Sequence, residues 1–311
     1  MSLQPTEAAF EGFRIVRRTP MVLVWWTLLY AAISLLSYWI MTSNIDALIA
    51  FSERAEEFQA IAEGGGQPSS AELGAFMQAW AAAMAPFSWL IPLSLIISSV
   101  LAAAVARAVL RPSEKAFGFL RLGGDELRVL VVSLVLTILI CLAGAGLVIA
   151  VAILAGFATN LSGGAQAGIG ILGVLAALGV MIWLLIRWSL AIPITVAEGR
   201  MAFFDSFRLT KGRFWPLLGM AVIAVIMAII IGLLSLIVAA PISLAAGGDV
   251  LGSMNTQDPA EALRSIRLDN PWMIASVILD AVINILCLGI VYAPFSAAYR
   301  DIVGGSARTA A

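Results

Sequence analysis

The sequence predicts an all-α polytopic membrane protein, with six transmembrane helices arranged as three hairpin repeats and amphipathic helices lying at the membrane interface. Composition is the first reason, because 61% of the 311 residues are hydrophobic and only 12% are charged. Soluble domains are about 45–50% apolar and about 25% charged. The second reason is a series of long apolar segments, and the third is an uneven distribution of the basic residues. Residues 1–311 are therefore predicted to form a single integral membrane domain.

A transmembrane helix requires about 20 consecutive, mostly apolar residues. Six segments meet this requirement: 21–41, 86–110, 127–157, 167–196, 215–240 and 271–299.

The two longest connections are predicted to be loops on the outer side of the membrane, over residues 43–85 and 241–270. In the first, apolar residues between Ile45 and Ile61 recur at helical spacing, which predicts an amphipathic helix. Ser69 and Glu72 have the spacing of a capping box and predict the start of a second helix. In the second loop, residues 258–261 (Asp-Pro-Ala-Glu) predict another helix start.

The basic residues predict the orientation of the chain. Fifteen of the eighteen fall in the termini, the connections and the adjoining span ends that six spans would place on one side, leaving Arg54, Arg264 and Arg267 for the other side. Positive residues are enriched on the cytoplasmic side of membrane proteins. We therefore expect both termini in the cytoplasm and the chain in a bacterial inner membrane. The acids are distributed in the opposite sense, with Asp280 alone inside the sixth span.

Several chemistries are excluded by residue type. The chain has no histidine, which removes Ser-His-Asp triads and histidine-ligated zinc or haem. Cys141 and Cys287 lie in apolar runs without metal-binding spacing. The glycines of Gly168–Gly173 match GxGxxG, but they open a predicted span and not a strand–turn–helix unit, so helix packing is the better interpretation. We expect no enzyme activity, cofactor, metal or nucleic-acid partner.

An internal repeat is suggested by the segments that precede the first and fifth spans. Phe10–Arg17 and Phe204–Lys211 share both phenylalanines and one arginine, and their other positions agree in type except one. A weaker, gapped similarity precedes the third span, in Ala116–Arg121. The pattern predicts three hairpins, each introduced by a short basic-aromatic helix in the inner interface.

The same region carries a resemblance to a known family. Arg187–Leu190 with Pro193, then Val196–Gly199, Ser206–Gly212 and the terminal Ala298–Asp301 resemble the bacterial YciC-like six-helix inner-membrane proteins and the membrane domain of some glycerophosphodiester phosphodiesterases. The resemblance covers about the last 130 residues in motifs and the rest in architecture only. It implies a six-span inner-membrane fold connected with lipid or envelope upkeep. No phosphodiesterase domain is present, so that activity is not implied.

A polar stripe marks the sixth span. Ser276, Asp280 and Asn284 are spaced four residues apart and share one helix face. A charge inside a bilayer costs at least about 2.5–3.5 kcal/mol, so such acids usually face the bundle or a water-filled cavity. Asp280 is a candidate proton- or cation-coupling group. The alternative is a protonated acid that joins helices by hydrogen bonds.

Basic residues near the inner ends of the spans are candidate contacts for lipid phosphate. They are Arg14, Arg17, Arg187, Arg208, Lys211 and Arg213. Membrane lipids are the expected partners, with a second copy of the chain or another membrane protein as further candidates. The expected function is a non-enzymatic, lipid- or envelope-associated organising or accessory role. The alternative is a transporter or channel that uses Asp280.

Overall fold

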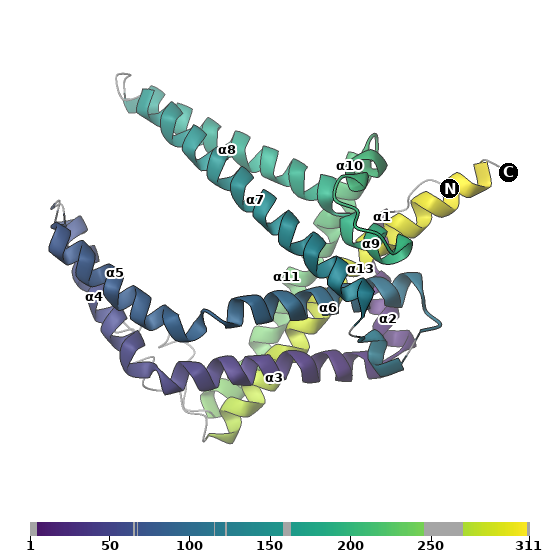
Figure 1. The fold of residues 1–311 in the computed structure, drawn as a ribbon, viewed down its shortest axis with the longest axis horizontal. Coiled ribbons are helices and arrows are strands. Elements are labelled where there is room, and N and C mark those ends of the chain that lie inside the picture. Colours follow the sequence, from purple (N-terminus) through teal and green to yellow (C-terminus); the bar gives the residue numbers. More distant parts are fainter. Residues whose placement is uncertain are drawn as a thin grey trace. The chain divides into compact units, whose positions relative to one another are not determined.

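The computed structural model describes residues 5–64, 66, 68–114, 116–121, 123–157, 163–245 and 270–309, and it is helical without strands over these ranges (Figure 1). The predicted all-α class is confirmed. The elements are α1 (Pro5–Ala9), α2 (Glu11–Arg18), α3 (Met21–Ser43), α4 (Ile45–Glu63), α5 (Ser70–Met84), η1 (Ala85–Phe87), α6 (Leu90–Leu110), η2 (Ala116–Phe119), α7 (Gly124–Phe157), α8 (Gly163–Trp188), α9 (Ala191–Glu198), α10 (Asp205–Thr210), α11 (Phe214–Ala245) and α13 (Pro271–Thr309).

Six helical segments are long and apolar enough to cross a membrane, as the sequence predicts. The chain is therefore a multi-pass membrane protein. The segments are α3, α6, α7, α8 with α9, α11 and α13. α11 continues to Ala245, beyond the predicted end of the fifth span at residue 240. The helix start predicted at residues 258–261 lies outside the described residues.

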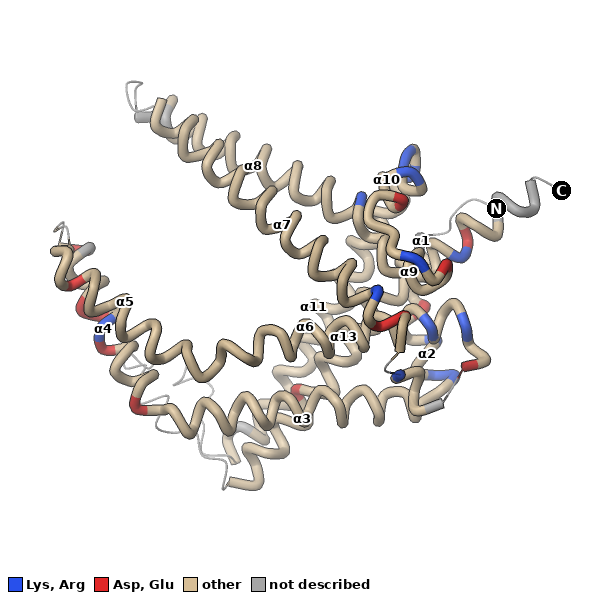
Figure 2. Tube along the Cα trace, viewed as in Figure 1, with Lys and Arg blue, Asp and Glu red and all other residues tan. Residues whose placement is uncertain are grey.

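Contacts between residues divide the chain into two compact units. Unit 1 consists of residues 1–22, 98–228 and 288–311, and unit 2 consists of residues 23–97 and 229–287. Fifteen of the eighteen basic residues belong to unit 1, the same fifteen that the sequence assigns to the inner side. Figure 2 shows in red the described acids on α4 and α5, and these two helices belong to unit 2. A single membrane domain over 1–311 stays a prediction.

Unit 2 contains a helical hairpin of α4 and α5 within the segment 43–85, and the outer location of this segment stays a prediction. The ring of Phe76 stacks on Phe58, with 4.8 Å between the centroids, so the hairpin has an aromatic core of its own. The predicted capping box is present: the Ser69 hydroxyl accepts the Glu72 N–H at 3.2 Å, and the Glu72 carboxylate accepts the Ser69 N–H at 2.7 Å. These bonds lower the pKa of Glu72, because they favour its charged form.

Small residues bring the helices of unit 1 close together. Ala103 and Ala106 of α6 pack with Val129 of α7 and Val196 of α9, and all four side chains are buried. Between α2 and α13, a Cβ added to Gly12 would lie 2.7 Å from the carbonyl oxygen of Gly289, so only glycine fits there. Backbone approach of this kind is typical of membrane helices.

The glycine-rich helices α7 and α8 form a second hairpin, within unit 1. Gly144 faces Met181, and Gly173 faces Val151 at an ordinary contact distance. Among the described residues, nothing lies within 4 Å of a Cβ added to Gly168 or Gly170. Helix packing therefore accounts for part of the glycine pattern and not for the first two glycines of the GxGxxG match.

A buried ion pair lies between α6 and α7. Arg107 is 1% exposed and Glu126 is 6% exposed. The Arg107 guanidinium donates to the Glu126 carboxylate and to the carbonyl of Phe119, and Glu126 also accepts the N–H of Gly123 at 3.0 Å. These bonds supply the partners that a buried charge requires.

The same arginine holds an unusual turn. Phe117, Gly118 and Phe119 all have left-handed backbone angles, with φ of 49°, 65° and 64°. Left-handed conformations cost about 1–3 kcal/mol each for residues other than glycine, so they persist only where surrounding contacts impose them. Here the Phe119 side chain is buried and its carbonyl accepts a hydrogen bond from Arg107, and both contacts hold the turn in place.

We expect Glu126→Gln to destabilise the protein by about 3–5 kcal/mol, because it leaves the Arg107 charge buried without a counter-ion. Unfolding followed by circular dichroism in detergent measures the change. Glu57→Gln is the matched control, since the Arg54–Glu57 pair at 2.7 Å is solvent-exposed and such pairs contribute little. Equal stability losses in the two variants would contradict the role assigned to the buried pair.

Candidate functional site

The site is built around a break in the fourth span. α8 ends at Trp188 and α9 begins at Ala191, so the interruption precedes Pro193. The proline ring has no N–H and clashes with the carbonyl four residues earlier, which belongs to Ser189. The helix is therefore interrupted about one turn before Pro193.

One hydroxyl bridges the break. The Oγ of Ser206, at the start of α10, accepts the N–H of Leu190 at 3.2 Å and donates to the carbonyl of Arg187 at 2.5 Å. Ser206 is fully buried. It corresponds to Gly12 in the proposed repeat, and both positions lie against another segment's backbone. The repeat itself stays a prediction.

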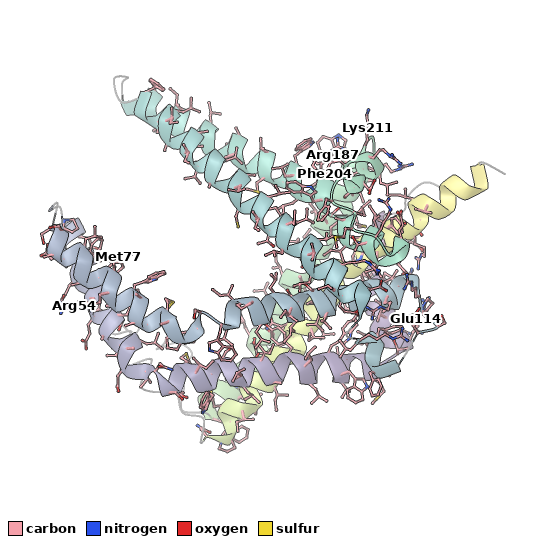
Figure 3. The ribbon with its side chains drawn as sticks, viewed as in Figure 1. Arg54, Met77, Glu114, Arg187, Phe204 and Lys211 are labelled. Carbon is pink, nitrogen blue, oxygen red and sulfur yellow. The ribbon has the colours of Figure 1, made fainter. Side chains whose placement is uncertain are left out.

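Arg187 ties α8 to α10. Its guanidinium donates to the carbonyl of Phe207 at 3.2 Å and to the hydroxyl of Thr210 at 3.3 Å, and it lies 5.4 Å from the ring centre of Trp183. The ring of Phe207 in turn contacts Trp183 and Trp188 edge-on. Figure 3 shows Arg187 beside the segment that carries Phe204 and Lys211. The contacts assign Arg187 a structural role in unit 1.

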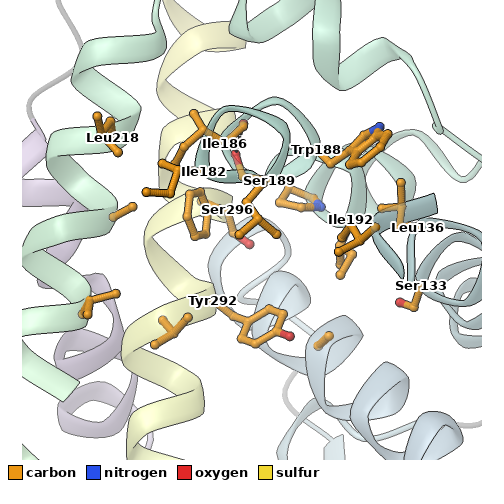
Figure 4. A pocket seen from close by; sticks show the side chains of 18 of the residues that line it. Ser133, Leu136, Ile182, Ile186, Trp188, Ser189, Ile192, Leu218, Tyr292 and Ser296 are labelled. Carbon is orange, nitrogen blue, oxygen red and sulfur yellow. Dashed lines mark hydrogen bonds between the residues drawn. The ribbon is translucent and has the colours of Figure 1, made fainter. Parts of the chain in front are cut away.

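An apolar cavity of about 600 Å³ lies within unit 1, next to the break (Figure 4). Residues of α6, α7, α8, α9, α11 and α13, together with Ser189 at the break, line it, and no charged side chain is among them. The volume is within the range of about 300–1,000 Å³ typical of small-molecule sites. All of the lining residues belong to the six candidate membrane-spanning segments.

All eight acids of unit 1 are in ion pairs within the unit. The pairs are Glu7 with Arg14; Glu11 with Arg14, Arg18 and Arg300; Glu114 with Arg111 and Arg121; Asp125 with Arg111 and Arg128; Glu126 with Arg107; Glu198 and Asp205 with Arg200; and Asp301 with Arg300. Hydrogen bonds to Asp205 and Glu198 raise the pKa of Arg200. The negative charge of unit 1 is therefore neutralised internally.

The cations outside these pairs are close to the set that the sequence predicts. Among the described side chains of unit 1, no ion pair is formed by Arg17, Arg187, Arg208, Lys211 or Arg213. All but Arg187 are exposed, and Lys211 points away from the surrounding helices in Figure 3. Arg14, the sixth predicted contact, bonds Glu11 at 3.3 Å, which raises its pKa.

The predicted polar stripe lies in unit 2, on α13. Ser276 donates to the carbonyl of Met273 at 2.7 Å, and the amide of Asn284 donates to the backbone carbonyl of Asp280 at 2.9 Å. Both bonds are made within α13, and the Asp280 carboxylate takes part in neither. That carboxylate is exposed and interacts electrostatically with Tyr30 of α3.

Sequence reasoning missed three components of unit 1. Arg107 and Glu126 look like ordinary ends of two spans, and their pairing becomes visible only when α6 and α7 meet. Ser206 belongs to the repeat motif, but nothing in the motif indicates that it bridges a helix break. The cavity is formed by residues from separate helices, and hydroxyl positions such as Ser133 and Ser296 carry no shared pattern along the chain.

We expect Ser206→Ala to destabilise unit 1 by about 1–3 kcal/mol for each backbone group left without its partner. It should also speed amide hydrogen exchange at Leu190, whose N–H loses its acceptor. Exchange measured by mass spectrometry reports the effect. Ser235→Ala is the control, because that hydroxyl bonds only the Gly232 carbonyl of its own helix among the described residues. Unchanged exchange at Leu190 would refute the bridging role.

The chain was compared with family models, curated proteins and solved structures, and no match was found in any of the three.

Proposed function

We propose that the chain is a non-enzymatic protein of the bacterial inner membrane that binds anionic lipids through the basic surface of unit 1 and has a lipid-organising or envelope-accessory role. The observation that carries the proposal is the charge inventory of unit 1. Its eight acids are all used in internal ion pairs, while Arg17, Arg208, Lys211 and Arg213 are exposed and outside those pairs. Each such cation near an anionic membrane surface contributes about 1 kcal/mol.

Aromatic rings accompany these cations, as expected for an interfacial location. Phe10 is 48% exposed and Phe13 is 40% exposed beside Arg17, and Phe204 is 66% exposed at the start of α10. Exposed rings next to basic residues are typical of helices that lie among acyl chains and anionic headgroups. With the termini on the cytoplasmic side, as the basic residues predict, these segments would contact the inner leaflet. The resemblance to the YciC-like proteins supports the same assignment.

A transporter or channel is the second candidate, and one observation favours it. The Asp280 carboxylate is exposed within a candidate span and is not used in the local bonds of α13. If Asp280 is a coupling group, the protein needs it for activity but not for folding. If Asp280 joins helices by hydrogen bonds, the protein needs it for folding. Unfolding measured on Asp280→Asn separates these two roles.

The lipid proposal predicts that Arg208→Gln/Lys211→Gln/Arg213→Gln loses preference for anionic lipid. At about 1 kcal/mol per cation, each substitution should weaken the preference about fivefold at low salt. The measurement is the ratio of phosphatidylglycerol to phosphatidylcholine that remains bound after reconstitution from an equal mixture. All three side chains are exposed, so the fold should persist.

The charge-preserving variant Arg208→Lys/Arg213→Lys is the control and should keep the preference. Added salt should reduce the preference of the unaltered protein, because exposed charges are screened. A neutralised variant that retains the full preference would overturn the proposal.

A further inference from the structure

The cavity of unit 1 contains hydroxyl groups without partners. Within the part of the chain that the structure describes, no hydrogen bond is formed by Ser133 and Thr137 of α7 or by Tyr292 and Ser296 of α13, and all four line the cavity. The two pairs are each spaced four residues apart and so lie on one face of their helix.

Other hydroxyls of unit 1 behave differently. Ser189 donates to the Ile186 carbonyl at 2.8 Å, Thr195 to the Ala191 carbonyl at 2.8 Å and Thr210 to the Ser206 carbonyl at 2.8 Å. Bonding back to the preceding turn is the usual way in which helical Ser and Thr satisfy their hydroxyls. Ser189 also lines the cavity, so among the described residues four of its five hydroxyls, those of Ser133, Thr137, Tyr292 and Ser296, have free donors.

We propose that this cavity holds the ester and adjoining acyl portion of a membrane phospholipid. The apolar wall suits the acyl chain, and the free hydroxyls are donors for the ester carbonyls, which have no donor of their own. No charged side chain lines the cavity, so the lipid's phosphate is not bound inside it. The inference rests on the proposed lipid-associated role and adds a defined site, separate from the exposed cations of α10 and its flank.

The location of the hydroxyls supports this occupant. Ser133 lies six residues, about 9 Å, inside the predicted start of the third span at residue 127, and Ser296 lies three residues, about 5 Å, from the predicted end of the sixth span at residue 299. Both hydroxyls are therefore near one edge of a hydrocarbon core about 30 Å thick, where the ester groups of phospholipids lie. Ser296 is 2% exposed, and its hydroxyl oxygen keeps some accessible surface, as expected for a group that opens onto the cavity.

The test uses the full chain in nanodiscs with a phospholipid that carries a photoreactive diazirine on its acyl chain near the ester. Crosslinks are mapped by peptide mass spectrometry. In the unaltered protein, we expect crosslinks on the cavity faces of α7 and α11. Ala221→Phe places a ring in the cavity from α11 and should reduce this labelling at least tenfold.

Ala152→Phe is the matched control, because Ala152 is exposed on α7 and does not line the cavity. It should leave the labelling unchanged. If Ala221→Phe does not fold, Ser133→Ala/Thr137→Val replaces it, and loss of two hydrogen bonds should weaken retention of the lipid about tenfold. Labelling that is insensitive to Ala221→Phe and to the hydroxyl substitutions would overturn the site.

The lipid headgroup separates this inference from the proposed function. Cavity labelling should be the same for phosphatidylglycerol and phosphatidylcholine probes, and it should survive Arg208→Gln/Lys211→Gln/Arg213→Gln. Loss of anionic preference with intact cavity labelling in that variant supports both proposals. Cavity labelling that requires the anionic headgroup would refute the inference while leaving the basic surface in place.

Discussion

A buried charge and an interrupted helix backbone inside unit 1 have to find partners within the protein, because the hydrocarbon of a membrane offers none. Arg107 meets this requirement through Glu126 and the Phe119 carbonyl, and the break in the fourth span meets it through Ser206. The turn at 117–119 and the short helix α10 are therefore parts of the packed structure. Each exists in its observed conformation because it supplies a carbonyl or a hydroxyl to a buried group on another helix.

Internal pairing also explains how a chain with a net charge of −1 presents a basic surface. Arginines of the same helix and of other segments reach the acids of unit 1, as in the Glu11 carboxylate, which pairs with Arg14 and Arg18 of its own helix and with Arg300 of α13. Once these pairs form, exposed cations such as Arg208 and Lys211 dominate the outward charge. The proposed lipid-binding role rests on this arrangement and not on the number of arginines.

The two proposed lipid contacts differ in chemistry. The exposed cations offer charge but no enclosed volume, whereas the cavity offers volume and hydroxyl donors but no charge. An anionic headgroup and an ester-linked chain differ in the same way. Asp280, on α13 of unit 2, belongs to neither and keeps the transporter hypothesis distinct.

The sequence by itself determined the six spans, the helical segment over 43–85 and the capping box at Ser69, because apolar length and cap spacing are properties of consecutive residues. It also indicated the basic surface but treated Arg187 and Arg208 alike. Only the tertiary structure decided that Arg187 is bonded to α10 while Arg208 is exposed. It likewise decided the pairing of Arg107 with Glu126 and the assembly of the cavity lining from separate helices. These features depend on which faces of the helices pack together. The helices are far apart in sequence, and no pattern of consecutive residues specifies which of their faces make contact.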